Sequence, residues 1–171
     1  MSTTTCNVTL NLKGQEVLST SEAPGANDES ERTFHYSGFQ FQKNITDTST
    51  PKIEKTPVER EITLTSGTTT IDLTAAATRA SRTIDNTGKK LVALLLKNVS
   101  TTNTVTIAPG SSNPYPLFGS GNSVVLQAGE TIAKAITGVA SGHSAVSGTV
   151  KNIDITGTNG EKLQLYFYFG T

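Results

Sequence analysis

The sequence contains no tryptophan, one cysteine and two histidines among its 171 residues, and these scarcities remove several kinds of chemistry. A lone cysteine, Cys6, cannot form an internal disulfide, and we expect it to pack as a small apolar residue in a first strand. His35 and His143 are more than a hundred positions apart. With a single cysteine they do not give the ligand spacing of a zinc site. The sequence therefore predicts no metal site and no cofactor.

An excess of charge of either sign is also lacking. Fourteen basic and fourteen acidic residues balance to a net charge of zero, so the chain has little electrostatic attraction for nucleic acid or for an anionic membrane surface. The first residues contain no basic and apolar leader, and the run Leu91–Leu96 is too short to span a bilayer. We therefore expect no secretory signal, no nucleic acid partner and no membrane partner. The sequons at Asn7, Asn44 and Asn98 are then expected to be unused.

What the chain does contain is threonine, glycine and short alternating apolar segments. Alternation of apolar and polar residues, with glycine turns between the segments, is typical of half-buried strands. This pattern predicts an all-β fold, an antiparallel β-sandwich of jelly-roll-like or immunoglobulin-like type, over residues 61–171. The segments are Ile62/Leu64, Ile71/Leu73, Val105/Ile107, Val124/Leu126 and Ile153/Ile155.

Three segments depart from this alternation. The runs Leu91–Leu96 and Leu163–Phe169 are apolar without regular alternation, which is typical of strands covered on both faces, either inside the domain or by a partner. Only Thr74–Arg82 has helical character, because it contains three consecutive alanines behind a threonine that could cap a helix. We expect one or two helical turns there and little or no helix elsewhere.

Residues 1–60 are predicted to form a separate N-terminal segment. Val8, Leu10 and Leu12 alternate as in a strand, and a turn at Lys13–Gly14 predicts a hairpin that continues into Val17–Leu18. Residues 19–32 are expected to form an exposed loop. Residues 44–60 are polar and contain two prolines, which predicts an extended strap leading into the sandwich.

An aromatic run lies between that loop and the strap. Phe34 and Tyr36 alternate in one phase, and Phe39 and Phe41 in the other, on either side of Gly38. A β-bulge at this glycine would place all four aromatic side chains on one face of the segment. We therefore include these four residues in a predicted interaction surface.

Segments that resemble catalytic or metal sites are incomplete. Gly142–Val146 begins like a nucleophile elbow around Ser144, but its last position is valine and no histidine follows it. Asp85–Gly88 lacks the spacing of a calcium loop and predicts an Asx-type turn. A pair of carboxylates acting on a glycoside is not excluded by sequence, although such sites usually stack sugars on aromatic rings and the chain has no tryptophan. We expect a protein that is not an enzyme.

The segment from Ser112 to Gly121 has two interpretations. Tyr115 stands between two prolines, and Phe118 follows shortly after. The segment is either an ordered loop that packs its aromatic residues into one end of the sandwich, or a protruding contact loop. On the second interpretation Tyr115 and Phe118 join the predicted interaction surface, and with Tyr36 they could form a small platform for a sugar.

From Thr69 to the C-terminus, the order of strands and glycine-containing loops resembles the small β-sandwich virion proteins of tailed bacteriophages, including head decoration, or cement, proteins. Two of the sequences in this order of strands and loops are Val-Val-Leu-Gln-Ala-Gly-Glu and Lys-Asn-Ile-Asp-Ile-Thr-Gly-Thr-Asn-Gly. The segments that carry it are 70–74, 91–98, 104–115, 117–119, 124–130 and 151–160.

The resemblance implies a non-catalytic structural role on a virus particle, and we expect a capsid decoration protein that binds shell subunits through contacts of its N-terminal arm and of an exposed sheet face. Its expected partners are a major capsid protein or another virion protein, and further copies of the chain in a homo-oligomer. The protein would be made in the bacterial host cytoplasm and located in the virion. The alternative is a receptor- or carbohydrate-binding module of a phage tail or fibre, or of a bacterial surface.

Overall fold

A computed structural model describes residues 6–11, 14–18, 32–36, 40–45, 52–54, 58–65, 67–78, 82–135 and 143–171. Every regular element in these ranges is a strand, which confirms the all-β prediction. None of the described residues belongs to a helix of the length and apolarity needed to cross a membrane. The chain divides into two compact units, one of residues Asn7–Asn44 and one of Met1–Cys6 with Ile45–Thr171.

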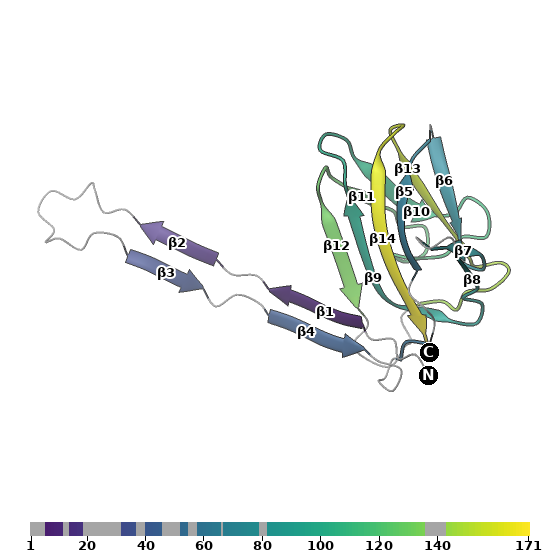
Figure 1. The fold of residues 1–171 in the computed structure, drawn as a ribbon, viewed down its shortest axis with the longest axis horizontal. Coiled ribbons are helices and arrows are strands. Elements are labelled where there is room, and N and C mark those ends of the chain that lie inside the picture. Colours follow the sequence, from purple (N-terminus) through teal and green to yellow (C-terminus); the bar gives the residue numbers. More distant parts are fainter. Residues whose placement is uncertain are drawn as a thin grey trace, which may run out of the picture. The chain divides into compact units, whose positions relative to one another are not determined.

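The larger unit contains a sandwich of two four-stranded antiparallel sheets (Figure 1). The tyrosine sheet, named after Tyr166 and Tyr168, has the order β12-β9-β14-β5. The threonine sheet, named after Thr68, Thr106 and Thr156, has the order β11-β10-β13-β6. The strands are β5 (Val58–Thr63), β6 (Gly67–Asp72), β9 (Lys90–Asn98), β10 (Val105–Pro109), β11 (Val124–Leu126), β12 (Thr131–Ala135), β13 (Asn152–Gly157) and β14 (Lys162–Gly170).

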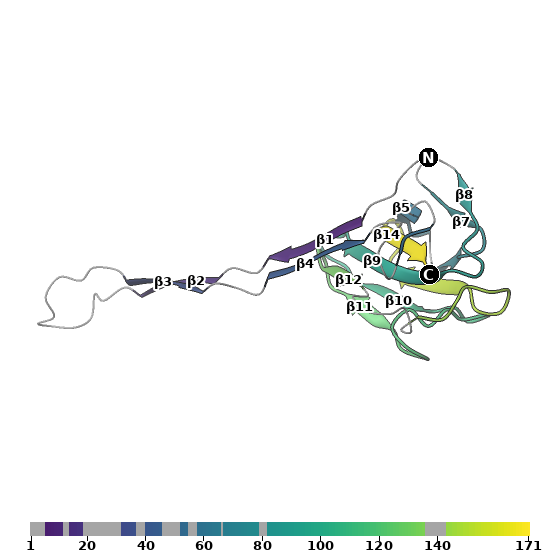
Figure 2. The same ribbon diagram turned by 90° about the horizontal axis from the view of Figure 1, so that it is seen from below.

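The order of pairing identifies the sandwich as a jelly roll. Of these eight strands, the first pairs with the last (β5 with β14), β6 pairs with β13, β9 with β12 and β10 with β11. The chain is therefore arranged as one long hairpin, with its tip between β10 and β11, that is rolled into two sheets (Figure 2). Eight strands wound in this way form the jelly-roll type of sandwich. The strand order thus selects between the two predicted types.

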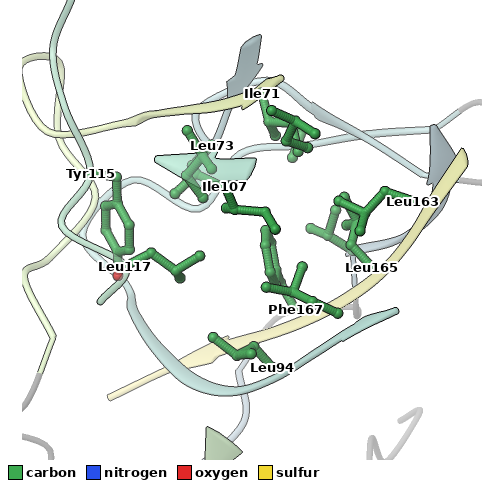
Figure 3. Close-up of a cluster of buried hydrophobic side chains, with 14 of the residues drawn as sticks. Ile71, Leu73, Leu94, Ile107, Tyr115, Leu117, Leu163, Leu165 and Phe167 are labelled. Carbon is green, nitrogen blue, oxygen red and sulfur yellow. The ribbon is translucent and has the colours of Figure 1, made fainter. Parts of the chain in front are cut away.

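The inner faces of the two sheets form the hydrophobic core (Figure 3). Leu94 and Phe167 of the tyrosine sheet meet Ile71 and Ile107 of the threonine sheet in this core. Full burial of each such side chain stabilises the fold by roughly 1.5–3 kcal/mol. The core accounts for the alternation in the sequence, because every second residue of a strand faces the opposite sheet.

The two continuous apolar runs differ in their burial. β9 has four consecutive buried residues, Leu91–Leu94, beside a register shift in its pairing with β14, as expected for a strand covered on both faces. β14 instead alternates, with its leucines and phenylalanines buried and Gln164, Tyr166 and Tyr168 partly exposed. The prediction that β14 is covered on both faces within the domain is therefore wrong, whereas coverage of its outer face by a partner stays a prediction.

A buried amide joins the two sheets near the end of β9. Asn98 is fully buried, and its side-chain NH₂ donates hydrogen bonds to the carbonyl oxygens of Asn103, Leu126 and Gln127 at 2.8, 3.2 and 3.0 Å. Its side-chain oxygen accepts a hydrogen bond from the Ser100 amide at 3.0 Å. Asn98 thereby connects β9 of the tyrosine sheet with β11 of the threonine sheet, since Leu126 ends β11.

The predicted helix at Thr74–Arg82 is wrong. Asp72 Oδ1 accepts hydrogen bonds from both the backbone amide and the hydroxyl of Thr74, which turns the chain instead of capping a helix. The following residues form β7 (Ala76–Ala77), which pairs with β8 (Thr83–Ile84). Ala76 is completely buried against the core, so tertiary packing overrides the helical propensity of the alanines.

Part of the predicted strap belongs to the sandwich. Ile53 is only 1% exposed and forms an isolated β-bridge with Gly170, flanked by backbone hydrogen bonds from Lys52 to Thr171 and from Glu54 to Phe169. A Cβ atom on Gly170 would lie 1.7 Å from the Lys52 carbonyl oxygen, so this close approach requires glycine. β5 also begins before the predicted domain boundary at residues 60 and 61, and the division between the units falls after Asn44.

The smaller unit consists of two-stranded ladders. β1 (Cys6–Asn11) pairs with β4 (Gln40–Ile45), and β2 (Gly14–Leu18) pairs with β3 (Arg32–Tyr36). The predicted hairpin between the first two strands is therefore wrong, because each of them pairs with a later strand. The predicted loop before β3 and the predicted bulge at Gly38 lie outside the described residues.

Candidate interaction surface

Tyr115 is a core residue and not a surface residue. It is 0% exposed, its hydroxyl donates a hydrogen bond to the Ser144 carbonyl at 3.0 Å, and it accepts one from the Leu91 amide at 3.2 Å. Burial raises the pKa of Tyr115 to about 12. The inclusion of Tyr115 in an interaction surface was wrong, and the ordered-loop interpretation holds for this residue. Two prolines restrict the backbone around it, which favours fixed packing of the ring.

The other predicted surface residues have different outcomes. Phe118 is partly buried and packs against the core. Phe34 and Tyr36 lie in β3, opposite Glu16 and Gly14 of β2, and Phe41 lies in β4. Phe39 lies outside the described residues, so the shared face of these four aromatic residues stays a prediction.

The outer face of the tyrosine sheet, which includes the C-terminal strand, carries a group of apolar residues that the sequence analysis did not name individually. In one row across the sheet, Leu95 of β9 lies between Ala133 of β12 and Tyr166 of β14. Leu95 and Tyr166 are partly exposed and Ala133 is exposed. Val99 follows on the same side of the β9 segment and is 36% exposed, one of two large apolar residues so exposed among the described residues.

Charged residues of both signs border this group. The next row contains Lys97, Gln164 and Glu61, on β9, β14 and β5. Glu61 accepts hydrogen bonds from Gln164 at 3.0 Å and from Lys162 at 2.9 Å. Lys97 is exposed on the opposite side of Gln164. The outer face of the tyrosine sheet therefore combines an apolar centre with a basic and an acidic margin.

The outer face of the threonine sheet is polar. The hydroxyls of Thr68 and Thr156 share a hydrogen bond of 2.8 Å across neighbouring strands, and Thr70 donates one of 2.6 Å to Asp154. Asp154 also accepts a hydrogen bond from the backbone amide of Ser111 at 2.8 Å. The large apolar residue on this face is Val125, which is 49% exposed at the sheet edge. The polar groups of this face largely satisfy one another.

The segment that resembles a nucleophile elbow has a structural role. The carbonyl of Ser144 accepts the Tyr115 hydrogen bond, and Ala145 bridges to Lys90. His143 is 7% exposed, and its Nδ1 atom has no hydrogen-bond partner among the described residues. Burial, with a contribution from Lys134, lowers the pKa of His143 to about 4. At neutral pH this buried imidazole is therefore uncharged.

The remaining polar motif is a turn. Asp85 accepts hydrogen bonds from the amide and the hydroxyl of Thr87, at 2.8 and 2.6 Å, and Gly88 follows with a φ of 76°. The predicted Asx-type turn is therefore confirmed. Within the described ranges, no three histidine, cysteine, aspartate or glutamate side chains are grouped as metal ligands would be.

A signal for the outer face was present in the sequence. In Leu-Gln-Leu-Tyr-Phe-Tyr-Phe of β14, the tyrosines occupy the same alternate positions as the glutamine. Tyrosine carries a hydroxyl and is suited to a half-exposed site, so counting it with glutamine reveals the alternation. Comparisons with protein-family models, with curated proteins and with solved structures find no significant match to this chain.

Proposed function

We propose that this chain is a structural protein of a tailed-phage virion, and that it decorates the capsid by binding shell subunits through its N-terminal unit. It acts by burying surface between proteins and not by catalysis. Its partners would be the major capsid protein or another virion protein, together with further copies of the chain.

The observation that carries this proposal is the separate N-terminal unit of residues Asn7–Asn44. Its strands are arranged in two-stranded ladders, β1 with β4 and β2 with β3. A two-stranded ladder has no second layer against which to bury a face, and it is at best marginally stable alone in water. Such a unit gains stability when it lies on another protein, or when that protein extends its ladder at a free edge.

The architecture of the larger unit agrees with this role by analogy. Jelly rolls are common in viral capsid and lectin domains, although a fold by itself does not determine a function. The lectin analogy keeps the alternative of a receptor- or carbohydrate-binding module. The support for the sugar-binding aromatic platform in that alternative is weaker, because Tyr115 is fully buried and Phe118 packs against the core.

The proposal is tested by cosedimentation of the purified chain with empty shells of the tailed phage that encodes it. We expect saturable binding by the wild-type chain, and loss of binding when Phe34 and Tyr36 are both replaced by glutamate. Thr156→Glu, on the outer face of the threonine sheet, is the control and should bind normally. Thermal melting of each variant shows whether the sandwich remains folded.

Two outcomes would oppose the proposal. Failure of the wild-type chain to bind shells, at concentrations that saturate a decoration site, would remove the shell as a partner. Binding to a glycan array or to bacterial cells that is lost with Phe118→Ala would favour the receptor-binding alternative. Tyr115 is unsuitable for that second test, because its replacement disturbs the core.

A further inference from the structure

We propose that two copies of this chain associate through the outer faces of their tyrosine sheets. This inference deepens the proposed function, since it names the surface and the partner for the homo-oligomer. It concerns the sandwich alone.

Apolar side chains are grouped on the outer face of the tyrosine sheet. Leu95, Tyr166 and Ala133 lie side by side in one row, and Val99 adds a large exposed side chain on the same side of β9. Tyrosine and aliphatic residues grouped in this way are typical of the centre of an interface. Covering the group removes this apolar area from water, which is the main driving force for association.

The charged residues of this face favour another copy of the chain as the occupant. The face carries Lys97 on β9, and across Gln164 it carries Glu61, which is paired with Lys162, so both signs are present at close range. A strongly basic or strongly acidic partner would meet repulsion from one of them, whereas a surface with the same mixed pattern can match both. The zero net charge of the chain means that two copies do not repel each other at long range.

The geometry of the rows allows such a match. A twofold axis parallel to the strands, between β9 and β14, would place Leu95 of each copy opposite Tyr166 of the other, because the two share a row. The same rotation places Lys97 opposite Gln164, with a sideways offset of about 4.8 Å, one strand spacing, from the strand that carries Glu61. Each contact then occurs twice in the dimer.

The size of the face sets the expected strength. A nine-residue strand such as β14 is about 30 Å long, and four strands are about 19 Å wide, which gives about 600 Å² per copy. Stable interfaces of standard size bury about 800 Å² per partner, so we expect a dimer that dissociates in the micromolar range.

The threonine sheet provides a matched control for the experiment. β9 and β10 are both second in their sheets, and β14 and β13 are both third. Glutamate at Leu95 or Tyr166 therefore has a structural counterpart in glutamate at Thr106 or Thr156. Sedimentation equilibrium of the full chain, over a micromolar concentration series, measures the dissociation constant of each variant.

We expect Leu95→Glu and Tyr166→Glu to weaken dimerisation at least tenfold, and Thr106→Glu and Thr156→Glu to leave it unchanged. Ala133→Glu, at an exposed position of the edge strand β12, gives the same test if either of the first two variants fails to fold. A wild-type chain that is monomeric throughout the series would overturn the inference, as would equal weakening by the control variants. Neither outcome bears on shell binding, which is measured separately by cosedimentation.

Discussion

The two sheets of the sandwich share one core but present opposite surfaces to their surroundings. On the threonine sheet, hydroxyl and carboxylate groups bond to one another, as in the Thr68–Thr156 and Thr70–Asp154 pairs. On the tyrosine sheet, Leu95, Tyr166 and Val99 leave apolar area uncovered within the described part of the chain. Both sheets bury their inner faces in the same core, but only the threonine sheet has an outer face whose polar groups bond to one another, and only the tyrosine sheet has an outer face with an apolar centre suited to contact.

The largest effect on stability is expected from removing the hydrogen bonds by which the Asn98 side chain connects the two sheets. Replacing Asn98 with alanine removes the NH₂ group that donates one buried and two partly buried hydrogen bonds to carbonyl oxygens, which we expect to lower the free energy of unfolding by roughly 3–4 kcal/mol. Urea denaturation measures the change. Asn122→Ala, where an exposed amide donates a single hydrogen bond of 3.3 Å, should change stability by no more than about 0.5 kcal/mol. If Asn98→Ala and Asn122→Ala lost equal free energy of unfolding, the buried amide of Asn98 would not stabilise the contact between the sheets.

The second effect concerns pH and the connection between β12 and β13. His143 has a pKa of about 4 in the folded protein and 6.5 as its ordinary value, so the unfolded chain binds the proton first. Stability should therefore be complete above pH 6.5 and fall as the pH drops toward 4, by up to about 3 kcal/mol. Urea denaturation at a series of pH values measures this slope, which His143→Gln should abolish.

Acidic groups act in a lower pH range. Hydrogen bonds from Lys52 and then Lys89 lower the pKa of Glu54 to about 2 from 4.5. Its contribution is present above pH 4.5 and is lost as the pH falls toward 2. A slope between pH 6.5 and 4.5 that survives in His143→Gln would therefore refute the assignment to His143.

A smaller effect is expected at Tyr115, whose loop follows β10 of the threonine sheet and bonds to β9 of the tyrosine sheet. Tyr115→Phe keeps the ring in the core and removes the hydroxyl bonds to Ser144 and Leu91. We expect a loss of about 1–2 kcal/mol in the free energy of unfolding. Thermal and urea denaturation should agree on its sign, and an unchanged stability would show that the hydroxyl bonds contribute nothing.

The smallest effect is expected on the polar outer face. Thr156→Val removes an exposed hydroxyl that bonds to Thr68, keeps the β-branched shape and should change stability by less than about 0.5 kcal/mol. Urea denaturation provides the value. A loss as large as that of Tyr115→Phe would mean that the hydroxyl pairs stabilise the threonine sheet. The polar outer face would then contribute to folding and would not serve only as solvent-exposed surface.

The sandwich could be predicted because its inner faces follow a local rule. Ile71, Ile107 and Ile155 each alternate with a polar neighbour, and all three are buried in the core. The pairing order could not be predicted in the same way, because β5 pairs with β14 across most of the chain and no local pattern encodes that choice. The distinction between a jelly roll and an immunoglobulin-like sandwich depends on such distant pairings.

The wrong predictions have specific physical causes. Ile53 is a single apolar residue among polar ones, so nothing local shows that it reaches the end of β14. Ala76 has a high helical propensity, but its burial and its pairing with Ile84 decide the outcome. Tyr115 was ambiguous because an aromatic residue between prolines is compatible with either an exposed or a buried loop.

The buried amide of Asn98 also determines how this protein should be produced. Asn98 begins the sequon Asn-Val-Ser, and the nitrogen that would carry a glycan is the one that donates to three carbonyl oxygens inside the sandwich. Passage through a eukaryotic secretory pathway would expose this nitrogen to oligosaccharide transfer before the sheets close. A sugar attached at that moment would stand where β9 and β11 must meet, so bacterial expression is the appropriate source of native material.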